Sequence, residues 1–150
     1  MIRLRDVRLD EIESLSQLCL RSKAVWGYDD AFMAACRAEL TLHPADLQST
    51  HLQAAAAETA LVGLVQIKVV GQDADLLKLF VEPGRLKSGV GRMLLGWATA
   101  RARSLHALRM IIEADPDAVP FYQRMGAHLA GSAASGSIPG RRLPRLILDL

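Results

Sequence analysis

Residues 75–100 read DLLKLFVEPGRLKSGVGRMLLGWATA, and this stretch decides how the rest of the chain is interpreted. It begins with an apolar strand over Leu76–Val81. A proline and a glycine follow and end the strand, because proline has no backbone N–H and glycine frees the backbone. Gly89 and Gly91 then open a helix in which the apolar residues recur at helical spacing.

The loop between this strand and this helix has the composition of a phosphate-binding site. Arg85 and Lys87 supply positive charge, and the two glycines let an anion approach the bare amides at the start of the helix. A Walker A motif is excluded because Lys87 precedes the glycines, and Arg92–Leu94 lack the third glycine of a dinucleotide fingerprint. A glycine pair also occurs in plain tight turns, so the spacing alone leaves the ligand open.

Hydrophobic periodicity and turn residues predict further strands and helices on both sides of this stretch. The expected strands are Ile2–Val7, His51–Ala57, Leu61–Val70, Leu108–Glu113 and Arg145–Leu150. The expected helices begin after Asp10, run from Asp29 or Asp30 to Leu40, and cover Ala118–Met125. Residues 40–50 and the Gly/Ser-rich residues 131–140 are expected to be loops. The strands between residues 51 and 81 are expected to form an antiparallel meander.

The composition indicates one globular domain over residues 1–150. The net charge of +2 is too small to indicate nucleic-acid binding, and Arg141, Arg142 and Arg145 are interpreted as part of a solvated loop. The N-terminus is too charged for a signal peptide and no apolar run spans a membrane, so we expect a cytoplasmic protein. Cys19 and Cys36 are expected to be buried thiols. The four histidines lack metal-ligand spacing, and we predict no metal.

A second motif follows at residues 115–126, which read DPDAVPFYQRMG. Together with LKLFVEPGRLKSGVGRMLLGWA, it strongly resembles the GCN5-related N-acetyltransferase (GNAT) family. In that family a [QR]xxGx[GA] pattern binds the pyrophosphate of acetyl-CoA, and a later helix carries a motif like N-P-x-A-x-x-F-Y-x-x-x-G. Leu86 stands where the family has Gln or Arg, and Asp115 stands where it often has Asn.

The resemblance implies an α/β fold with a mixed, mostly antiparallel sheet of six or seven strands flanked by about four helices. Two central strands splay apart, and acetyl-CoA, the co-substrate, lies between them. The implied reaction is direct attack of a primary amine on the thioester, with Tyr122 as general acid for the leaving thiolate. The implied acetyl-CoA-binding residues are Leu79, Phe80, Val81, Lys87, Ser88, Gly89, Val90, Gly91, Arg92, Asp115 and Tyr122.

The acceptor, a small-molecule or peptide amine, and the general base are less well defined. Glu113 is the first candidate for the base, and the weaker ones are Glu39, Glu58, Glu82 and His128. Trp26 and Tyr28, between two helices, are either core residues or an aromatic wall of the acceptor pocket.

In the family layout the loop 132–142 lines the acceptor side. There Ser137, with Ser135 and Arg141, either binds a polar or acidic acceptor or is part of a mobile loop. A non-catalytic acyl-CoA-binding regulatory module is the alternative function. A nucleic-acid-binding protein that uses the C-terminal arginines is a third, weaker reading. A homodimer is left open.

Overall fold

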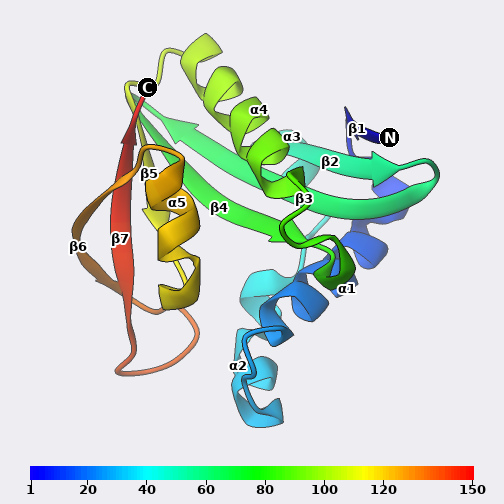
Figure 1. The fold of residues 1–150 in the computed structure, drawn as a ribbon, viewed down its shortest axis with the longest axis horizontal. Coiled ribbons are helices and arrows are strands. Elements are labelled where there is room, and N and C mark those ends of the chain that lie inside the picture. Colours follow the sequence, from blue (N-terminus) through cyan, green and yellow to red (C-terminus); the bar gives the residue numbers. More distant parts are fainter.

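The computed structural model describes all residues 1–150 and contains one seven-stranded sheet covered by helices (Figure 1). The strands are β1 (Ile2–Arg5), β2 (His51–Ala57), β3 (Ala60–Val70), β4 (Asp73–Val81), β5 (Arg109–Glu113), β6 (His128–Ala134) and β7 (Arg142–Asp149). The helices are α1 (Ile12–Ala24), α2 (Asp30–Leu40), α3 (Asp46–Ser49), α4 (Val90–Ser104) and α5 (Val119–Arg124). Short 3-10 helices occupy Leu9–Glu11, Pro83–Arg85 and Pro116–Ala118.

The strand order in the sheet is β1-β2-β3-β4-β5-β7-β6. Every neighbouring pair is antiparallel except β4 and β5, which are parallel and joined through α4. A parallel pair needs a long crossover connection, whereas hairpins join the antiparallel strands β2, β3 and β4. The structure therefore confirms the mixed, mostly antiparallel sheet and the meander expected from the sequence.

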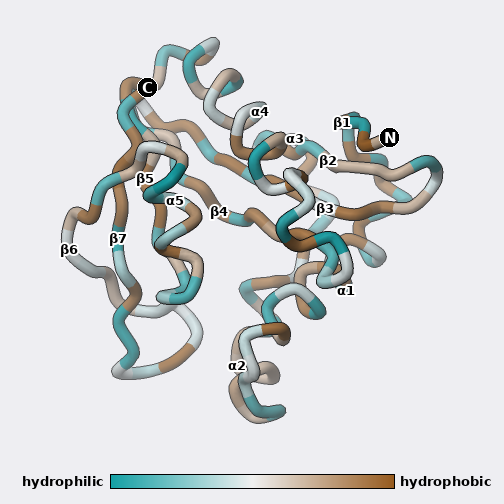
Figure 2. The backbone as a smooth tube through the Cα atoms, viewed as in Figure 1, coloured by the Kyte–Doolittle hydropathy of each residue, from teal (hydrophilic) through white to brown (hydrophobic).

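The helices divide between the two faces of the sheet. Residues of α4 and α5 belong to the larger hydrophobic core, whereas α1 and α2 belong to a smaller one. The neighbouring residues Leu64 and Val65 of β3 contribute to different cores, because successive side chains of a strand point to opposite faces. Hydrophobic residues dominate β3 where α4 crosses it (Figure 2). The expected burial of Cys19 and Cys36 is confirmed, since each is less than 5% exposed.

A close approach between α4 and β3 depends on Gly63. A Cβ atom at this position would lie 2.8 Å from Leu94 Cδ1 and 3.0 Å from Val90 Cγ1. Such distances are too short for carbon atoms, so any larger residue would push α4 away from the sheet. Because Val90 is the first residue of α4, this contact also fixes where the helix begins.

Several boundaries differ from the sequence-based expectations. The first strand ends at Arg5 and not at Val7, and the last begins at Arg142 and not at Arg145. The Gly/Ser-rich segment 131–140 is partly strand, because β6 extends to Ala134. Gly131 has a φ of 88° at an irregularity in the β6–β7 ladder, so its glycine bends the strand and does not end it. The expected loop 40–50 contains the single-turn helix α3. No helix of the protein combines the length and the apolar character needed to cross a membrane.

Candidate active site

The central strands β4 and β5 pair along only part of their length. Their register runs from Asp73 opposite Arg109 to Leu76 opposite Ile112, and no residue of β4 beyond Leu76 pairs with β5. On the other side, β4 stays paired with β3 as far as Val81. The expected splaying of the two central strands is therefore confirmed. A cavity of about 600 Å³ extends along the open edge of β4.

Backbone amides of β4 face this open edge. Glu82 donates its N–H to the carbonyl of Val62 in β3 at 2.8 Å. Because N–H groups alternate in direction along a strand, the amides of Leu79 and Val81 point away from β3. Phe80, between them, packs its side chain against the core under α1 and α2. All three residues line the cavity.

One end of the cavity is the N-terminus of α4. Gly89 precedes the helix with a φ of 89°, a conformation that glycine adopts without strain. The first backbone bond of the helix runs from the Met93 amide to the Gly89 carbonyl at 3.0 Å. The earlier amides of the turn donate to no acceptor within the chain, as is usual at a helix start. These are the amides of Lys87, Gly89, Val90, Gly91 and Arg92.

The side chains around this end of the cavity are basic and mostly exposed. Arg85, Lys87 and Arg92 line the cavity, whereas Ser88 bonds through its hydroxyl to the carbonyl of Arg85. Leu86, at the position where the family has Gln or Arg, is 43% exposed. Unpaired amides, nearby cations and the helix dipole together make this end suited to a phosphate group. We call it the α4 end of the cavity.

Gly91 lies against the aromatic pair of α5. A Cβ at Gly91 would lie 3.4 Å from Phe121 Cζ and 3.8 Å from Val81 Cγ2. The rings of Phe121 and Tyr122 meet edge to face with centroids 5.1 Å apart. This packing connects the start of α4 with the helix that carries Tyr122.

Tyr122 lines the cavity and is only 7% exposed. Burial raises the pKa of its phenol above the ordinary value, and neither a charge nor a hydrogen bond opposes this shift. The hydroxyl is therefore protonated at neutral pH and has no competing partner in the chain. Chemically, it is a proton or hydrogen-bond donor that is ready for a ligand in the cavity.

The candidate bases separate into those at the cavity and those elsewhere. Glu113 and Glu39 line the cavity, and Glu113 is exposed at the end of β5. Glu82 is held by Arg21, with N–O distances of 3.0 and 2.6 Å, and does not line the cavity. Glu58 and His128 are also outside its lining. Of the weaker candidates for the general base, only Glu39 lines the cavity.

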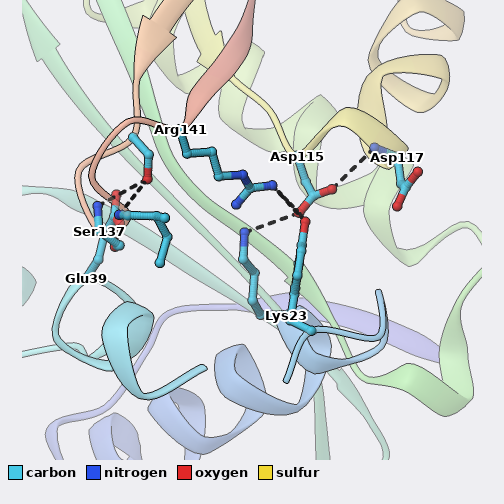
Figure 3. A network of polar contacts seen from close by, with 9 residues as sticks. Lys23, Glu39, Asp115, Asp117, Ser137 and Arg141 are labelled. Atoms are coloured by element: carbon cyan, nitrogen blue, oxygen red, sulfur yellow. Dashed lines mark hydrogen bonds and ion pairs between the residues drawn. The ribbon is translucent and has the colours of Figure 1, made fainter. Parts of the chain in front are cut away.

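The other end of the cavity carries a network of polar side chains from four separate segments (Figure 3). Lys23 of α1 lies 3.3 Å from Asp115 Oδ2, and Arg141 Nη2 lies 3.7 Å from the same oxygen. Tyr28 donates its hydroxyl to Asp115 and accepts a hydrogen bond of 2.8 Å from Arg141. We call these four residues the acceptor-end network.

The two aromatic residues of the α1–α2 junction have different positions. Trp26 lines the cavity and is 40% exposed, so it is not a core residue. The Tyr28 ring stacks on Phe32 with centroids 3.9 Å apart and lies behind the cavity wall. Burial, followed by the neighbouring carboxylate of Asp115, raises the pKa of Tyr28 to about 12. Tyr28 therefore stays a neutral phenol, and its hydroxyl bonds to Asp115 and Arg141 behind the cavity wall.

The remaining expected residues also lie at this end. Ser137 lines the cavity and donates its hydroxyl to Glu39, which ties the β6–β7 loop to α2. Asp115 lines the cavity too, and its carboxylate is occupied by Lys23, Tyr28 and Arg141. A contact between Asp115 and pantetheine stays a prediction. No three metal-binding side chains converge in the structure.

Sequence reasoning missed two lysines of the cavity, Lys23 and Lys78. Lys78 donates to the side-chain oxygen of Gln66 at 3.0 Å, and burial lowers its pKa. A charged residue inside the apolar strand LLKLF was a usable signal for Lys78. Lys23 gave no such signal, because a lysine in the last turn of a helix is commonly a surface residue.

Comparisons with known proteins agree on one family. A family model described as an acetyltransferase (GNAT) domain matches residues 17–134. The chain is similar to the PaiA N-acetyltransferase of Thermoplasma acidophilum in complex with coenzyme A. The TM-score is 0.78 at 17% identity, with 100% of this chain and 99% of that chain covered.

Two further solved structures have the same fold. For a GCN5-related N-acetyltransferase of Rhodopseudomonas palustris, the TM-score is 0.80 at 19% identity, covering 99% of this chain and 95% of that one. For the ribosomal-protein-S18-alanine N-acetyltransferase of Escherichia coli, the TM-score is 0.72 at 15% identity, covering 99% and 94%. No curated protein matches the chain in sequence.

Proposed function

The chain belongs to the acetyltransferase (GNAT) family and is an acyl-CoA-dependent acetyltransferase with acetyl-CoA as co-substrate, and from this premise we propose that it acetylates a primary amine. The amine attacks the thioester directly, without a covalent enzyme intermediate, and Tyr122 is the general acid. Residues 1–150 form a single acetyltransferase domain in this proposal. Bound acetyl-CoA supplies a thioester whose carbonyl carbon accepts the amine and whose sulfur leaves as a thiolate.

The parting of β4 from β5 is the observation that carries this proposal. The gap begins beyond Leu76 and runs between unpaired amides of β4 on one side and Tyr122 on the other. At the α4 end it meets a turn of free amides. An extended ligand with a diphosphate at one end and a reactive carbonyl at the other fits these features in order.

In the proposed complex, the α4 end binds the pyrophosphate. The free amides of Gly89, Val90, Gly91 and Arg92 donate to its oxygens, and Ser88 and Lys87 complete the turn. Because Leu86 offers no hydrogen bond, backbone donors and the side chains of Lys87 and Arg92 carry the interaction. The turn does not have to become ordered when the ligand binds, since α4 already packs closely against β3 at Gly63.

The open edge of β4 then aligns the thioester. The amides of Leu79 and Val81 bond to the pantetheine arm as a neighbouring strand would, and Phe80 supports this edge from the opposite face. An amide of this edge also polarises the thioester carbonyl as negative charge develops on its oxygen.

Tyr122 acts on the leaving sulfur. Because burial raises the phenol pKa, Tyr122 is protonated whenever substrate binds. A raised pKa also makes complete proton transfer from the phenol to a thiolate energetically uphill. The hydrogen bond that Tyr122 donates to the sulfur is therefore the first part of its role, and the proton follows as the sulfur gains charge.

The amine must lose a proton before it attacks, since an amine such as that of a lysine side chain has a pKa of about 10.4. Glu113, which lines the cavity at the end of β5, is the proposed base, acting directly or through water. Trp26 and Ser137 line the acceptor side, and Tyr28 supports it from behind.

A thiol-release assay tests this proposal. Purified protein is incubated with acetyl-CoA and a panel of amino acids, polyamines, aminoglycosides and peptides, and free CoA is measured. Acceptor-dependent release, with the acetylated amine identified by mass spectrometry, is the expected result. If calorimetry detects acetyl-CoA binding but every amine leaves the rate at the level of slow hydrolysis, the protein is an acyl-CoA-binding module and the proposal is wrong.

A further inference from the structure

We infer that the acetyl acceptor is an amine that also carries a carboxylate, such as a free amino acid, and that Arg141 and Lys23 bind this carboxylate. The inference rests on the proposed function and specifies the substrate class of the same site. It follows from the charge, the orientation and the unused hydrogen-bond donors of the acceptor-end network.

The acceptor-end network has more positive than negative charge. Lys23 and Arg141 share the single carboxylate of Asp115, at 3.3 and 3.7 Å. Tyr28 is the fourth member and adds no charge, because its phenol stays protonated. The side chains of Lys23, Arg141 and Asp115 are only 15%, 20% and 8% exposed. A cation without a full counter-charge at such a poorly hydrated site attracts an anionic ligand group.

The guanidinium of Arg141 is fixed in orientation. Its central carbon lies 4.9 Å from the centroid of Phe32 and 5.2 Å from that of Tyr28, so the stacked rings hold the cation by cation–π attraction. Nη2 donates to the Tyr28 hydroxyl at 2.8 Å. An arginine held at one nitrogen and against two rings keeps its remaining edge in one direction, and Arg141 lines the cavity.

Two nitrogens of this guanidinium, Nε and Nη1, donate to no atom of the chain, since the only side-chain hydrogen bond of Arg141 is made by Nη2. Guanidinium donors match the two oxygens of a carboxylate, and such charge-assisted pairs are among the strongest hydrogen bonds in proteins. Lys23, which also lines the cavity, adds a second cation on the same side of Asp115. The network therefore has both the free donors and the charge that a carboxylate requires.

Acidic residues elsewhere in the cavity complement the other end of such a substrate. Glu113 and Glu39 line the same cavity outside the network, and Glu39 is held in place by Ser137. Asp117, a third acid of the lining, is exposed in the turn after Asp115. An amino acid in solution carries an ammonium group as well as a carboxylate. One group then faces the cations and the other faces the carboxylates of the lining.

Matched acceptors test the inference in the wild-type protein. Alanine, phenylalanine and glutamate are compared with their α-carboxamides in the thiol-release assay. We expect kcat/KM to be about 10- to 100-fold higher for the free carboxylates, in line with a hydrogen-bonded ionic contact. Equal or higher kcat/KM for the carboxamides overturns the inference while leaving the proposed acetylation of amines intact.

Variants locate the carboxylate contact. Arg141→Gln and Lys23→Met should raise KM for the free amino acids by about 10-fold or more and change KM for the carboxamides by less than about 3-fold. Arg142→Gln is the matched control, because Arg142 is exposed, bonds to Ser132 and is outside the cavity lining. A loss of selectivity in the control, or none in Arg141→Gln, contradicts the assignment.

A binding measurement separates the inference from catalysis. Calorimetry of the CoA-loaded protein with N-acetylphenylalanine and with its carboxamide reports the carboxylate contact without turnover. Tighter binding of the free acid, lost in Arg141→Gln with CoA affinity unchanged, supports the inference even if no amine is acetylated. Equal affinity for the acid and the amide overturns it.

Discussion

The two ends of the cavity are built in opposite ways. The α4 end is made of backbone amides from five residues of one turn, Lys87 and Gly89–Arg92. Glycines keep this turn open. The acceptor-end network is made of side chains from α1, the α1–α2 junction, the turn after β5 and the loop before β7. A backbone site recognises a group common to many ligands, whereas assembled side chains select one ligand. The difference predicts that changes at the α4 end affect acetyl-CoA and that changes in the network affect the acceptor.

The largest expected effect is at Gly91. In Gly91→Glu the new side chain contacts Phe121, and it brings a carboxylate to the turn that binds the pyrophosphate in the proposed complex. Repulsion of about 4 kcal/mol from a nearby phosphate charge predicts a loss of CoA affinity of about 1,000-fold, measured by calorimetry. Gly96→Glu is the control, because Gly96 lies on the same helix and a Cβ there meets nothing within 4 Å. Retained CoA binding in Gly91→Glu would break the assignment of the α4 end.

Between the two ends, Tyr122→Phe should affect only the chemical step. We expect kcat to fall by about 100-fold, the lower range for loss of a general acid, with acetyl-CoA affinity and melting temperature unchanged. The fold should tolerate the change because the hydroxyl has no partner in the chain that would be left unsatisfied. Equal kcat values for wild type and variant would remove Tyr122 from the mechanism.

The pH profile gives a second test of Tyr122. Its folded-state pKa is raised above 10, so the catalytic proton is retained as pH rises and is lost only above the raised pKa. The kcat/KM of the wild type should therefore not decline between pH 8 and 10. A decline with a midpoint below pH 10 would show that another group supplies the proton.

Asp115→Asn should have a smaller effect, and it tests whether Asp115 contributes to acceptor binding or to CoA binding. The substitution leaves Lys23 and Arg141 without their shared counter-charge, so the protein should lose about 2 kcal/mol of stability in urea unfolding. CoA affinity should change by less than about 3-fold if the carboxylate belongs to the acceptor end. A larger loss of CoA affinity would favour the contact with pantetheine. Asp117→Asn, an exposed change that leaves the ion pairs of Asp115 intact, serves as the control for stability.

The smallest expected effect is that of Lys87→Gln. If backbone amides dominate the α4 end, loss of one exposed cation weakens CoA binding by only about 3- to 10-fold, and high salt reduces the difference. Arg103→Gln, an exposed change in the last turn of the same helix, should have no effect. A loss from Lys87→Gln as large as that from Gly91→Glu would mean that side chains, not amides, hold the phosphate.

The local structure of the α4 end could be predicted from the sequence, because the strand, the loop and the helix that form it follow one another in the chain. The apolar strand, the glycines and the helix pattern of residues 75–100 each have a local cause, and the structure places them as expected. The meander followed from hairpin spacing, and the mixed, mostly antiparallel sheet followed from the family resemblance. Boundaries were weaker where local preference and pairing disagree, as in β6, whose small residues resemble a loop and are ordered by pairing with β7.

The acceptor-end network was only partly predictable. Lys23 and Asp115 are 92 positions apart, and Tyr28 and Arg141 are 113 apart. Their meeting depends on α1 packing below the sheet and on the β6–β7 loop folding towards it, which no local pattern encodes. Tyr28 was expected to be either a core residue or a wall residue, and its contact with Arg141 depends on the stacking of its ring on Phe32.

The short ladder between β4 and β5 has a mechanical consequence. It divides the protein into two leaves, β1–β4 and β5–β7, joined by pairing from Asp73 and Arg109 to Leu76 and Ile112 and by α4. A bound ligand that bonds to both leaves links them across the seam, which is the unpaired boundary between β4 and β5. Amide hydrogen exchange in β5 and β7 should therefore slow markedly when CoA is present, since opening the seam would require releasing the ligand first.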